Sequence, residues 1–265
     1  MNTIKVYDGP SLLDGQRIIV LLTGLKNSSS NTKTGDMLQT WILRHDIAPN
    51  EAVKTGDDSS ICGNCPLRPI HYKSNGMRKP CYVKTFQAPL STWKANKDLP
   101  VHDPRAVKQL IDGRKVRRGS YGDPNAVPIS VWKMLDNGER PTGYTHQWRT
   151  LDIVSGVGGA NLSAYVMASV HSSTERAQAK SNGYRTFRII SDVSEIETGE
   201  ILCPASKEAG ARTTCEKCGL CNGSKAVISE REFIDGDFPT HLKIGTDIFV
   251  DWKRDKRKDV AIVAH

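Results

Sequence analysis

Short runs of apolar, β-branched and aromatic residues alternate with polar stretches along this chain. Such runs predict β-strands, because β-branched and aromatic side chains fit the pleated surface of a sheet. Eight runs meet this description, at residues 18–24, 81–86, 116–122, 143–148, 164–170, 184–190, 200–205 and 260–265. The pattern therefore predicts a fold with many short strands.

Three polar stretches between these runs predict helices, at residues 104–112, 126–137 and 172–182. The first follows Asp103, a favourable N-cap, and has proline at its first position. The third begins with Ser-Ser-Thr-Glu and stops at Gly183, so both of its ends are marked. With the strands before and after it, this third helix predicts a parallel β-α-β crossover.

Eight strands with crossovers in 265 residues predict an α/β fold. A (β/α)₈ barrel has about 250 residues and is the architecture we expect, with a doubly wound open sheet as the alternative. We expect a single α/β domain over residues 1–265. A Cys-rich loop at 57–81 and a Cys-rich insertion at 203–241 lie within it.

The composition and charge of the chain limit the class of protein to which it can belong. The chain is 38% hydrophobic and 25% charged, which excludes wholesale disorder. No apolar run approaches the roughly 20 residues of a membrane span, and the N-terminus lacks the apolar core of a signal peptide. We therefore expect a soluble, cytoplasmic protein. Lys and Arg number 37 against 29 Asp and Glu, and the net charge of +8 favours an anionic partner, nucleic acid first.

The seven cysteines fall into two groups, which in a reducing compartment indicate metal sites rather than disulfides. In the second group, Cys215, Cys218 and Cys221 follow one another at intervals of two intervening residues. Three thiolates at this spacing can converge on one soft cation, with Cys203 or His241 as the fourth ligand. Zinc is the expected metal, and an iron–sulfur cluster is the alternative.

The first group lies in a loop rich in Gly, Pro and Asn. Cys62 and Cys65 form a C-x₂-C pair, and Cys81 with His71 completes a Cys₃His set. A metal ion in such a loop replaces a missing hydrophobic core. The alternative is a loop of thiols without metal.

Residues at the ends of predicted strands are the candidates for chemistry, since active sites of α/β barrels lie there. Asp123 follows the strand at 116–122 and is the expected nucleophile or general base; as the alternative, it caps the next helix. His146 and Gln147 alternate along a strand, so one of them faces the interior and can read a base edge. A hydrogen-bonded core histidine is the alternative for His146.

Other residues are candidates for binding nucleic acid. Arg117 and Arg118 belong to the densest basic patch and are expected to contact phosphates. Tyr121 is a candidate to stack on bases, with a place in the hydrophobic core as the alternative. Arg188 is unusual in an apolar strand and either binds phosphate or pairs with an acidic side chain. Asn27 lies at another predicted strand end.

Several segments together resemble a family of Cys-rich bacteriophage proteins: NTKTGDMLQTWILR, ICGNCPLRP, GSYGDP, GYTHQW, VMASV, GYRTFRII, CPAS and CEKCGLCNG. A barrel with a C-terminal Cys triad followed by a histidine is also similar to the tRNA-guanine transglycosylase superfamily, whose phage members insert 7-deazaguanine bases into DNA. That resemblance implies a zinc enzyme in the host cytoplasm. Asp123 would attack the C1′ carbon and displace guanine, and Cys215, Cys218, Cys221 and His241 would hold the zinc.

Base exchange on DNA, or less favourably on tRNA, is therefore the first functional hypothesis. Two alternatives stay open. One is a non-catalytic, metal-stabilised phage protein that binds nucleic acid, and the other is an iron–sulfur redox protein.

Overall fold

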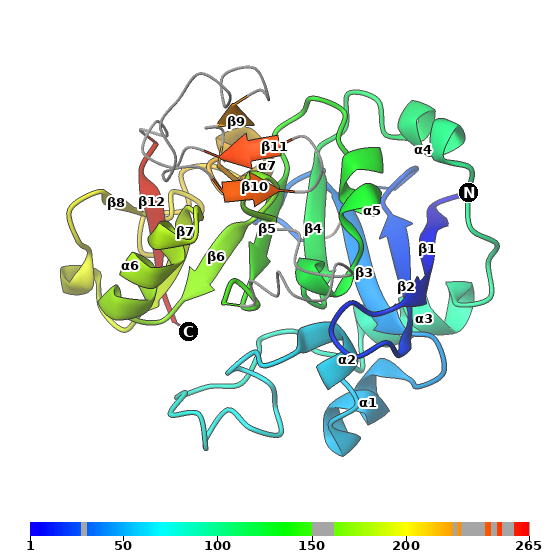
Figure 1. The fold of residues 1–265 in the computed structure, drawn as a ribbon, viewed down its shortest axis with the longest axis horizontal. Coiled ribbons are helices and arrows are strands. Elements are labelled where there is room, and N and C mark those ends of the chain that lie inside the picture. The colour runs from blue at the N-terminus through cyan, green and yellow to red at the C-terminus, as the bar shows by residue number, and fades with distance from the viewer. Residues whose placement is uncertain are drawn as a thin grey trace. The chain divides into compact units, whose positions relative to one another are not determined.

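The computed structural model describes residues 1–27, 31–149, 162–224, 227–228, 242–244, 248–250 and 257–264 (Figure 1). The chain divides into two compact units. Unit 1 comprises Met1–Ser30 and Asp36–Arg140, and unit 2 comprises Asn31–Gly35 and Pro141–His265. The single domain expected from the sequence stays a prediction. Within the described ranges, no helix is long and apolar enough to cross a membrane.

Unit 1 contains a sheet of four strands in the order β1-β2-β3-β4. The strands are β1 (Thr3–Pro10), β2 (Arg17–Thr23), β3 (Leu38–Arg44) and β4 (Val116–Tyr121). β1 pairs with β2 and β2 with β3 in antiparallel fashion, whereas β3 and β4 are parallel. The five central residues of β2, Ile18 to Leu22, are buried and form the middle of the core.

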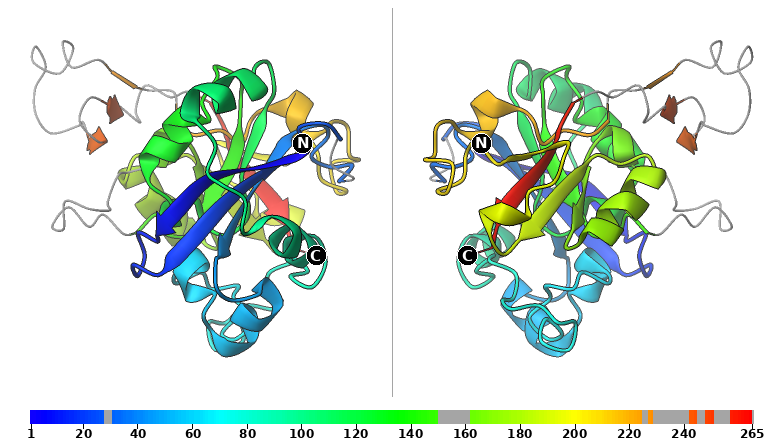
Figure 2. Two further views of the ribbon diagram at one scale, coloured as in Figure 1. Left: turned by 90° about the vertical axis from the view of Figure 1, so that its right-hand side faces the viewer. Right: turned by 90° about the vertical axis from the view of Figure 1, so that its left-hand side faces the viewer.

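The helices of unit 1 are short. They are α1 (Pro49–Thr55), α2 (Ser59–Cys62), α3 (Ala88–Asn96), α4 (Pro104–Leu110), the 3-10 turn η1 (Pro124–Ala126) and α5 (Ile129–Met134). α1 and α2 follow β3 and lie beyond the carboxyl end of that strand (Figures 1 and 2). Because β4 is parallel to β3, its carboxyl end is at the same edge of the sheet.

Unit 2 contains a parallel sheet in the order β5-β6-β7-β12-β8. Its strands are β5 (Thr142–Thr145), β6 (Met167–Val170), β7 (Thr186–Ile190), β8 (Glu200–Leu202) and β12 (Asp259–Val263). Its helical segments are η2 (Leu162–Ala164), α6 (Ser173–Ser181), η3 (Val193–Glu195) and α7 (Cys215–Cys218). Three further strands, β9 (Val227–Ile228), β10 (Leu242–Ile244) and β11 (Ile248–Val250), form a small antiparallel sheet in the order β10-β11-β9.

The predicted crossover β6-α6-β7 is confirmed. The Ser172 hydroxyl accepts the Glu175 N–H at the start of α6, and Ala168 pairs with Thr186 in the parallel ladder. The α/β class is confirmed with it. The (β/α)₈ barrel is not confirmed, because the pairings among β1, β2 and β3 are antiparallel and an eight-stranded parallel barrel has none of these.

The predicted strand at 81–86 is wrong. This segment forms no strand, and the rings of Tyr82 and Phe86 are exposed. The predicted helix at 126–137 is shorter in the structure, where η1 is followed by a bend at Val127, and α5 starts at Ile129 with Pro128 as its N-cap. Proline lacks a backbone N–H and therefore separates the two segments.

An ion-pair cluster on β1 gives a prediction for the pH dependence of stability. The Asp8 carboxylate accepts from Arg17 Nε at 2.7 Å and from Lys5 Nζ at 2.7 Å, and the Arg17 bond contributes most to lowering the pKa of Asp8 to about 2. A folded-state pKa below the unfolded value stabilises the protein above about pH 4, and this stabilisation is lost as the pH falls toward 2. Asp8→Asn should lower the free energy of unfolding by about 1–2 kcal/mol at pH 7, allowing for partial exposure of Arg17.

Urea unfolding at pH 7 and at pH 2.5 measures this effect. The exposed Asp112→Asn is the control and should change neither value. A loss in Asp8→Asn that is equally large at both pH values would contradict the electrostatic origin.

Candidate metal centres and nucleic-acid interface

Four cysteines of unit 2 line one cavity. Cys203 directly follows β8, Cys215 and Cys218 begin and end α7, and Cys221 follows the turn after α7. Leu220 and Val260 are among the apolar residues around them. The structure thus places the predicted C-x₂-C-x₂-C triad and Cys203 around one space, with the number and type of donor atoms that a structural zinc site uses.

Backbone hydrogen bonds fix the turns that carry these thiols. The Cys203 N–H donates to Ala261 O at 2.8 Å, and the Cys221 O accepts the Gly143 N–H at 3.1 Å. Gly219 ends α7 with φ of 59°, a left-handed conformation that favours glycine. The thiols are therefore presented by turns anchored to β12 and β5.

The strap residues 31–35, which belong to unit 2, bind the start of α7. Lys33 O accepts the Cys215 N–H at 2.8 Å, and Thr34 O accepts the Glu216 N–H at 3.1 Å. The first N–H groups of a helix have no partner within the helix. The strap satisfies two of them and holds the Cys215 turn in place.

Burial raises the pKa of two of these thiols, Cys203 and Cys221. The pKa of Cys221 is raised to about 12 by burial, to which the neighbouring thiolates of Cys203, Cys215 and Cys218 add. A bound cation reverses this preference, since thiolates are the metal ligands. Among the described residues, no group of three or more His, Cys, Asp or Glu side chains is arranged to hold a metal ion. A metal ion in this cavity requires the thiols to turn toward one another, and it stays a prediction.

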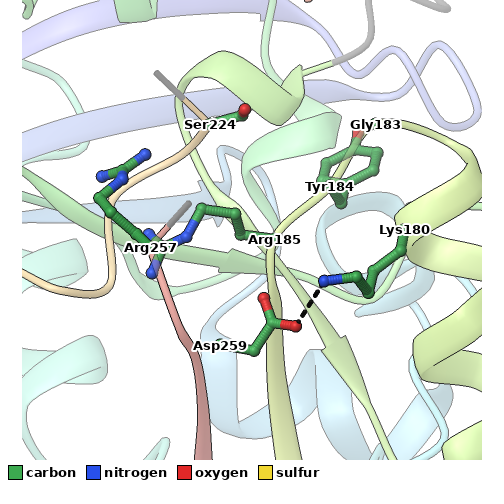
Figure 3. A pocket seen from close by; sticks show the side chains of 7 residues that line it. All are labelled: Lys180, Gly183, Tyr184, Arg185, Ser224, Arg257 and Asp259. Carbon is green, nitrogen blue, oxygen red and sulfur yellow. Dashed lines mark hydrogen bonds and ion pairs between the residues drawn. The ribbon is translucent and has the colours of Figure 1, made fainter. Parts of the chain in front are cut away.

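Two arginines anchor the chain after Cys221. Arg185 Nη1 donates to Leu220 O at 2.8 Å and to Asn222 O at 3.0 Å, and Arg257 Nη2 donates to Gly223 O at 2.7 Å. They line a second cavity with Lys180, Gly183, Tyr184, Ser224 and Asp259, in which Lys180 pairs with Asp259 (Figure 3). These guanidinium groups donate to main-chain carbonyls and so hold the loop after Cys221 in place. We therefore assign them a structural role and do not interpret this cavity as a ligand site.

The first Cys group lies at the carboxyl edge of β3 and β4 in unit 1. Cys62 ends α2, and its carbonyl accepts the Cys65 N–H at 3.1 Å. The Cys81 N–H donates to Leu67 O at 2.7 Å, which brings Cys81 back to this turn. These bonds bring together the three cysteines that the sequence predicted as one set.

Arg68 braces the same loop from inside. Its guanidinium donates to Asp58 Oδ1 at 2.6 Å, to Gly56 O at 2.6 Å and to Gly63 O at 3.3 Å. Burial raises the pKa of all three thiols, to about 12 for Cys65. His71, the predicted fourth ligand, has an exposed side chain. Three half-buried cysteines without His71 are therefore what the structure places here.

Asp123 adopts the capping role that was its alternative. It directly precedes η1, and its carboxylate accepts the Asn125 N–H at 2.9 Å. Its own N–H donates to Ile61 O at 2.6 Å, and only 6% of the residue is exposed. The structure thus places Asp123 beside the first Cys group, as a buried helix cap.

His146 lies next to His171, which the sequence analysis did not name as a candidate residue. His146 follows β5 and His171 follows β6, and their Nε2 atoms lie 3.2 Å apart. Burial lowers the pKa of His146 to about 3 and lowers the pKa of His171 as well. Both rings are therefore neutral at pH 7, and one donates its Nε2–H to the other. Two histidines in contact can pass a proton from one ring to the other. The catalytic role of His146 stays a prediction.

Four residues that the sequence predicted to bind nucleic acid are buried inside the protein. Arg118 and Tyr121 are buried in unit 1. Arg188 forms a buried ion pair, with Nε 2.8 Å from Glu200 Oε1, so the pairing that was its alternative is present. Gln147 is buried, and its N–H donates to the Thr145 hydroxyl at 2.9 Å. These four side chains are not presented on the surface.

Two predicted residues are accessible or partly so. Asn27 is exposed in unit 1, with its N–H donated to Asn2 Oδ1 at 3.0 Å. Arg117 is half-buried, and its Nη2 donates to the exposed Tyr82 hydroxyl at 2.6 Å. His241 lies outside the described residues.

Tyr82 lies in a basic stretch of the chain that sequence reasoning missed. Residues 59–97, here called the basic segment, contain no Asp or Glu. They contain seven Lys and Arg residues, namely Arg68, Lys73, Arg78, Lys79, Lys84, Lys94 and Lys97. Five of these are exposed: Lys73, Arg78, Lys79, Lys84 and Lys94. The absence of acidic residues between Asp58 and Asp98 was the signal in the sequence that could have found it.

Comparison with known proteins gives no match. No protein-family model, curated protein or solved structure was found to match this chain. The resemblance to Cys-rich phage proteins and to the transglycosylases therefore stays a prediction.

Proposed function

We propose that this protein binds nucleic acid through the basic segment and that its two Cys groups hold structural zinc. The observation that carries the proposal is a run of 39 residues, 59–97, with seven cationic side chains and no anionic one. Nucleic-acid affinity depends first on Lys and Arg contacts to the phosphate backbone. The exposed members of this run offer such contacts without a nearby carboxylate in the same segment.

The Cys groups support the zinc part of this proposal. Cys62, Cys65 and Cys81 tie together the loop from which the basic side chains project. The cavity lined by Cys203, Cys215, Cys218 and Cys221 offers the four-thiolate set typical of closed structural zinc sites. An iron–sulfur cluster is the alternative occupant, and DNA is the expected partner ahead of tRNA.

Guanine exchange through Asp123 stays a prediction, and the geometry favours binding over it. The Asp123 carboxylate is engaged as a cap, and neither of the two cavities described above is lined by this residue. A nucleophilic carboxylate must reach within about 3–3.5 Å of its target carbon. The cap would have to open before Asp123 attacked a nucleotide.

Charge reversal in the basic segment is the test. The double variant Arg78→Glu/Lys79→Glu should weaken DNA binding by at least about tenfold at low salt. It should also reduce the slope of log affinity against log salt by about two, since each phosphate contact contributes about 0.9. Fluorescence anisotropy with labelled DNA across a salt series measures both.

The double variant Lys108→Glu/Lys133→Glu is the matched control. Both lysines are exposed in unit 1 outside the basic segment, so the net charge changes equally. This control should bind far more tightly than the first variant. Equal weakening in both would mean that overall charge alone drives binding, and absence of binding by the unmodified protein at low salt would refute the proposal.

A further inference from the structure

Two exposed aromatic rings project from the basic segment. Tyr82 is 73% exposed and Phe86 is 65% exposed. In the part of the chain that the structure describes, every other Phe, Tyr and Trp side chain is buried or half-buried. Leaving large rings in water forgoes about 1.5–3 kcal/mol each, so two exposed rings four residues apart in the chain are a candidate contact site.

The Tyr82 ring is held at its hydroxyl end. Arg117, on β4, donates from Nη2 to the Tyr82 hydroxyl at 2.6 Å. This bond restricts the ring while most of its surface stays accessible. The arrangement places a guanidinium group and an aromatic ring side by side, as a contact to a phosphate and its base requires.

Exposed cations flank both rings. Arg78 and Lys79 precede Tyr82 closely in the chain, and Lys84 lies between Tyr82 and Phe86. No ion pair within the described ranges involves any of these three cations. Alternation of cationic and aromatic side chains is typical of surfaces that follow a single strand, where the cations contact phosphates and the rings stack on bases.

From these observations we infer that the partner is single-stranded nucleic acid and that Tyr82 and Phe86 stack on its bases. The inference rests on the proposed nucleic-acid function and names the form of nucleic acid. A duplex keeps its bases stacked on each other, so it offers exposed rings no free base faces. An unpaired strand offers a face at every nucleotide, whatever its sequence.

The test compares a labelled oligothymidylate with a duplex of equal length, both of about 20 nucleotides, which exceeds the ~4–16 nucleotides of one binding fold. Fluorescence anisotropy should show tighter binding of the single strand. Tyr82→Ala should weaken single-strand binding by roughly 5- to 150-fold, the equivalent of stacking on one base, and leave duplex binding within about twofold. Phe86→Ala should act in the same direction.

Tyr82→Phe is the control, because it keeps the ring and removes only the hydroxyl bound by Arg117; it should stay within about threefold of the unmodified protein. If Tyr82→Ala and Phe86→Ala bind both nucleic acids normally while Arg78→Glu/Lys79→Glu does not, the stacking inference fails and the proposed function stands. If neither nucleic acid binds, both fail. Binding to phosphatidylserine vesicles in place of either nucleic acid would also overturn both, because it assigns the surface to an anionic membrane.

Discussion

Cys221→Ser is expected to abolish binding of the proposed zinc ion in unit 2. The loss of the metal should in turn unfold residues 203–224. Cys221 lines the cavity with three other thiols, and its carbonyl holds the Gly143 N–H of β5. Structural zinc contributes about 10–16 kcal/mol in zinc-finger peptides, as much as the whole stability of about 5–15 kcal/mol of a typical domain. Metal analysis with native mass spectrometry and hydrogen exchange over this region measures the loss.

Two further variants make this result specific. Thr213→Ala removes a hydroxyl that donates only to the adjacent Thr214 carbonyl in the described contacts, and it should keep the full metal content. Cys62→Ser should remove a metal ion from unit 1 and leave the exchange pattern of residues 203–224 unchanged. A Cys221→Ser protein with unchanged metal content and protection would overturn the metal centre. A brown colour of the purified protein would indicate that an iron–sulfur cluster is bound in place of zinc.

Removing the Glu200 carboxylate is expected to destabilise unit 2 by about 3–5 kcal/mol, the usual effect of leaving a buried charge without its partner. Glu200 has a fully buried side chain that receives Arg188 through Nε at 2.8 Å and lies 3.3 Å from Arg176 Nε. In Glu200→Ala the Arg188 guanidinium stays buried with only the Glu195 carbonyl and the more distant Glu197 carboxylate. Urea unfolding followed by the fluorescence of the buried Trp148 measures the change.

Glu195→Ala is the control for Glu200→Ala. Glu195 is exposed and caps η3, so its removal should cost only about 1 kcal/mol. Replacing both partners, in Arg188→Met/Glu200→Leu, should recover most of the lost stability, because no unpaired charge remains. Single-strand DNA binding should be unchanged in the double variant. A large loss of binding would return Arg188 to the phosphate-contacting role that its position in the sequence suggested.

The parts of the fold that were predictable are those with local signals. α6 was found because Ser172 and Gly183 mark its ends, and the caps are present in the structure. β7 and β12 are largely apolar runs, and neighbouring parallel strands bury them. Signals of this kind depend on a few adjacent residues and need no knowledge of distant contacts.

β3 was missed because its polar residues find partners only in the folded chain. Gln39 and Thr40 interrupt the apolar run, yet both are buried. The Thr40 hydroxyl donates to Arg117 O at 2.9 Å and accepts the Gly119 N–H at 2.8 Å, and Gln39 Oε1 accepts from the Ser120 hydroxyl at 2.7 Å. These contacts join residues almost 80 positions apart, and no local pattern contains them.

The candidate sites likewise include features that local sequence predicts and features that depend on the folded chain. The spacing of the cysteines predicted which thiols gather, because a C-x₂-C turn is local and the structure has it at both groups. The partnership of His146 with His171 depends on the order of β5 and β6 in the sheet, which sequence spacing does not give. Finding the basic segment needed only a count of the acidic residues between Asp58 and Asp98.

The strap at residues 31–35 determines when unit 2 can finish folding, because it is far in the sequence from the rest of that unit. During synthesis these five residues leave the ribosome long before α7, with which they share two hydrogen bonds. These two hydrogen bonds can therefore form only after Cys215 and Glu216 have been made. A fragment that starts at Pro141 lacks them altogether and leaves the Cys215 and Glu216 amides to water. A fragment of unit 2 therefore needs residues 31–35 in addition to the chain from Pro141 onward if it is to keep these two hydrogen bonds.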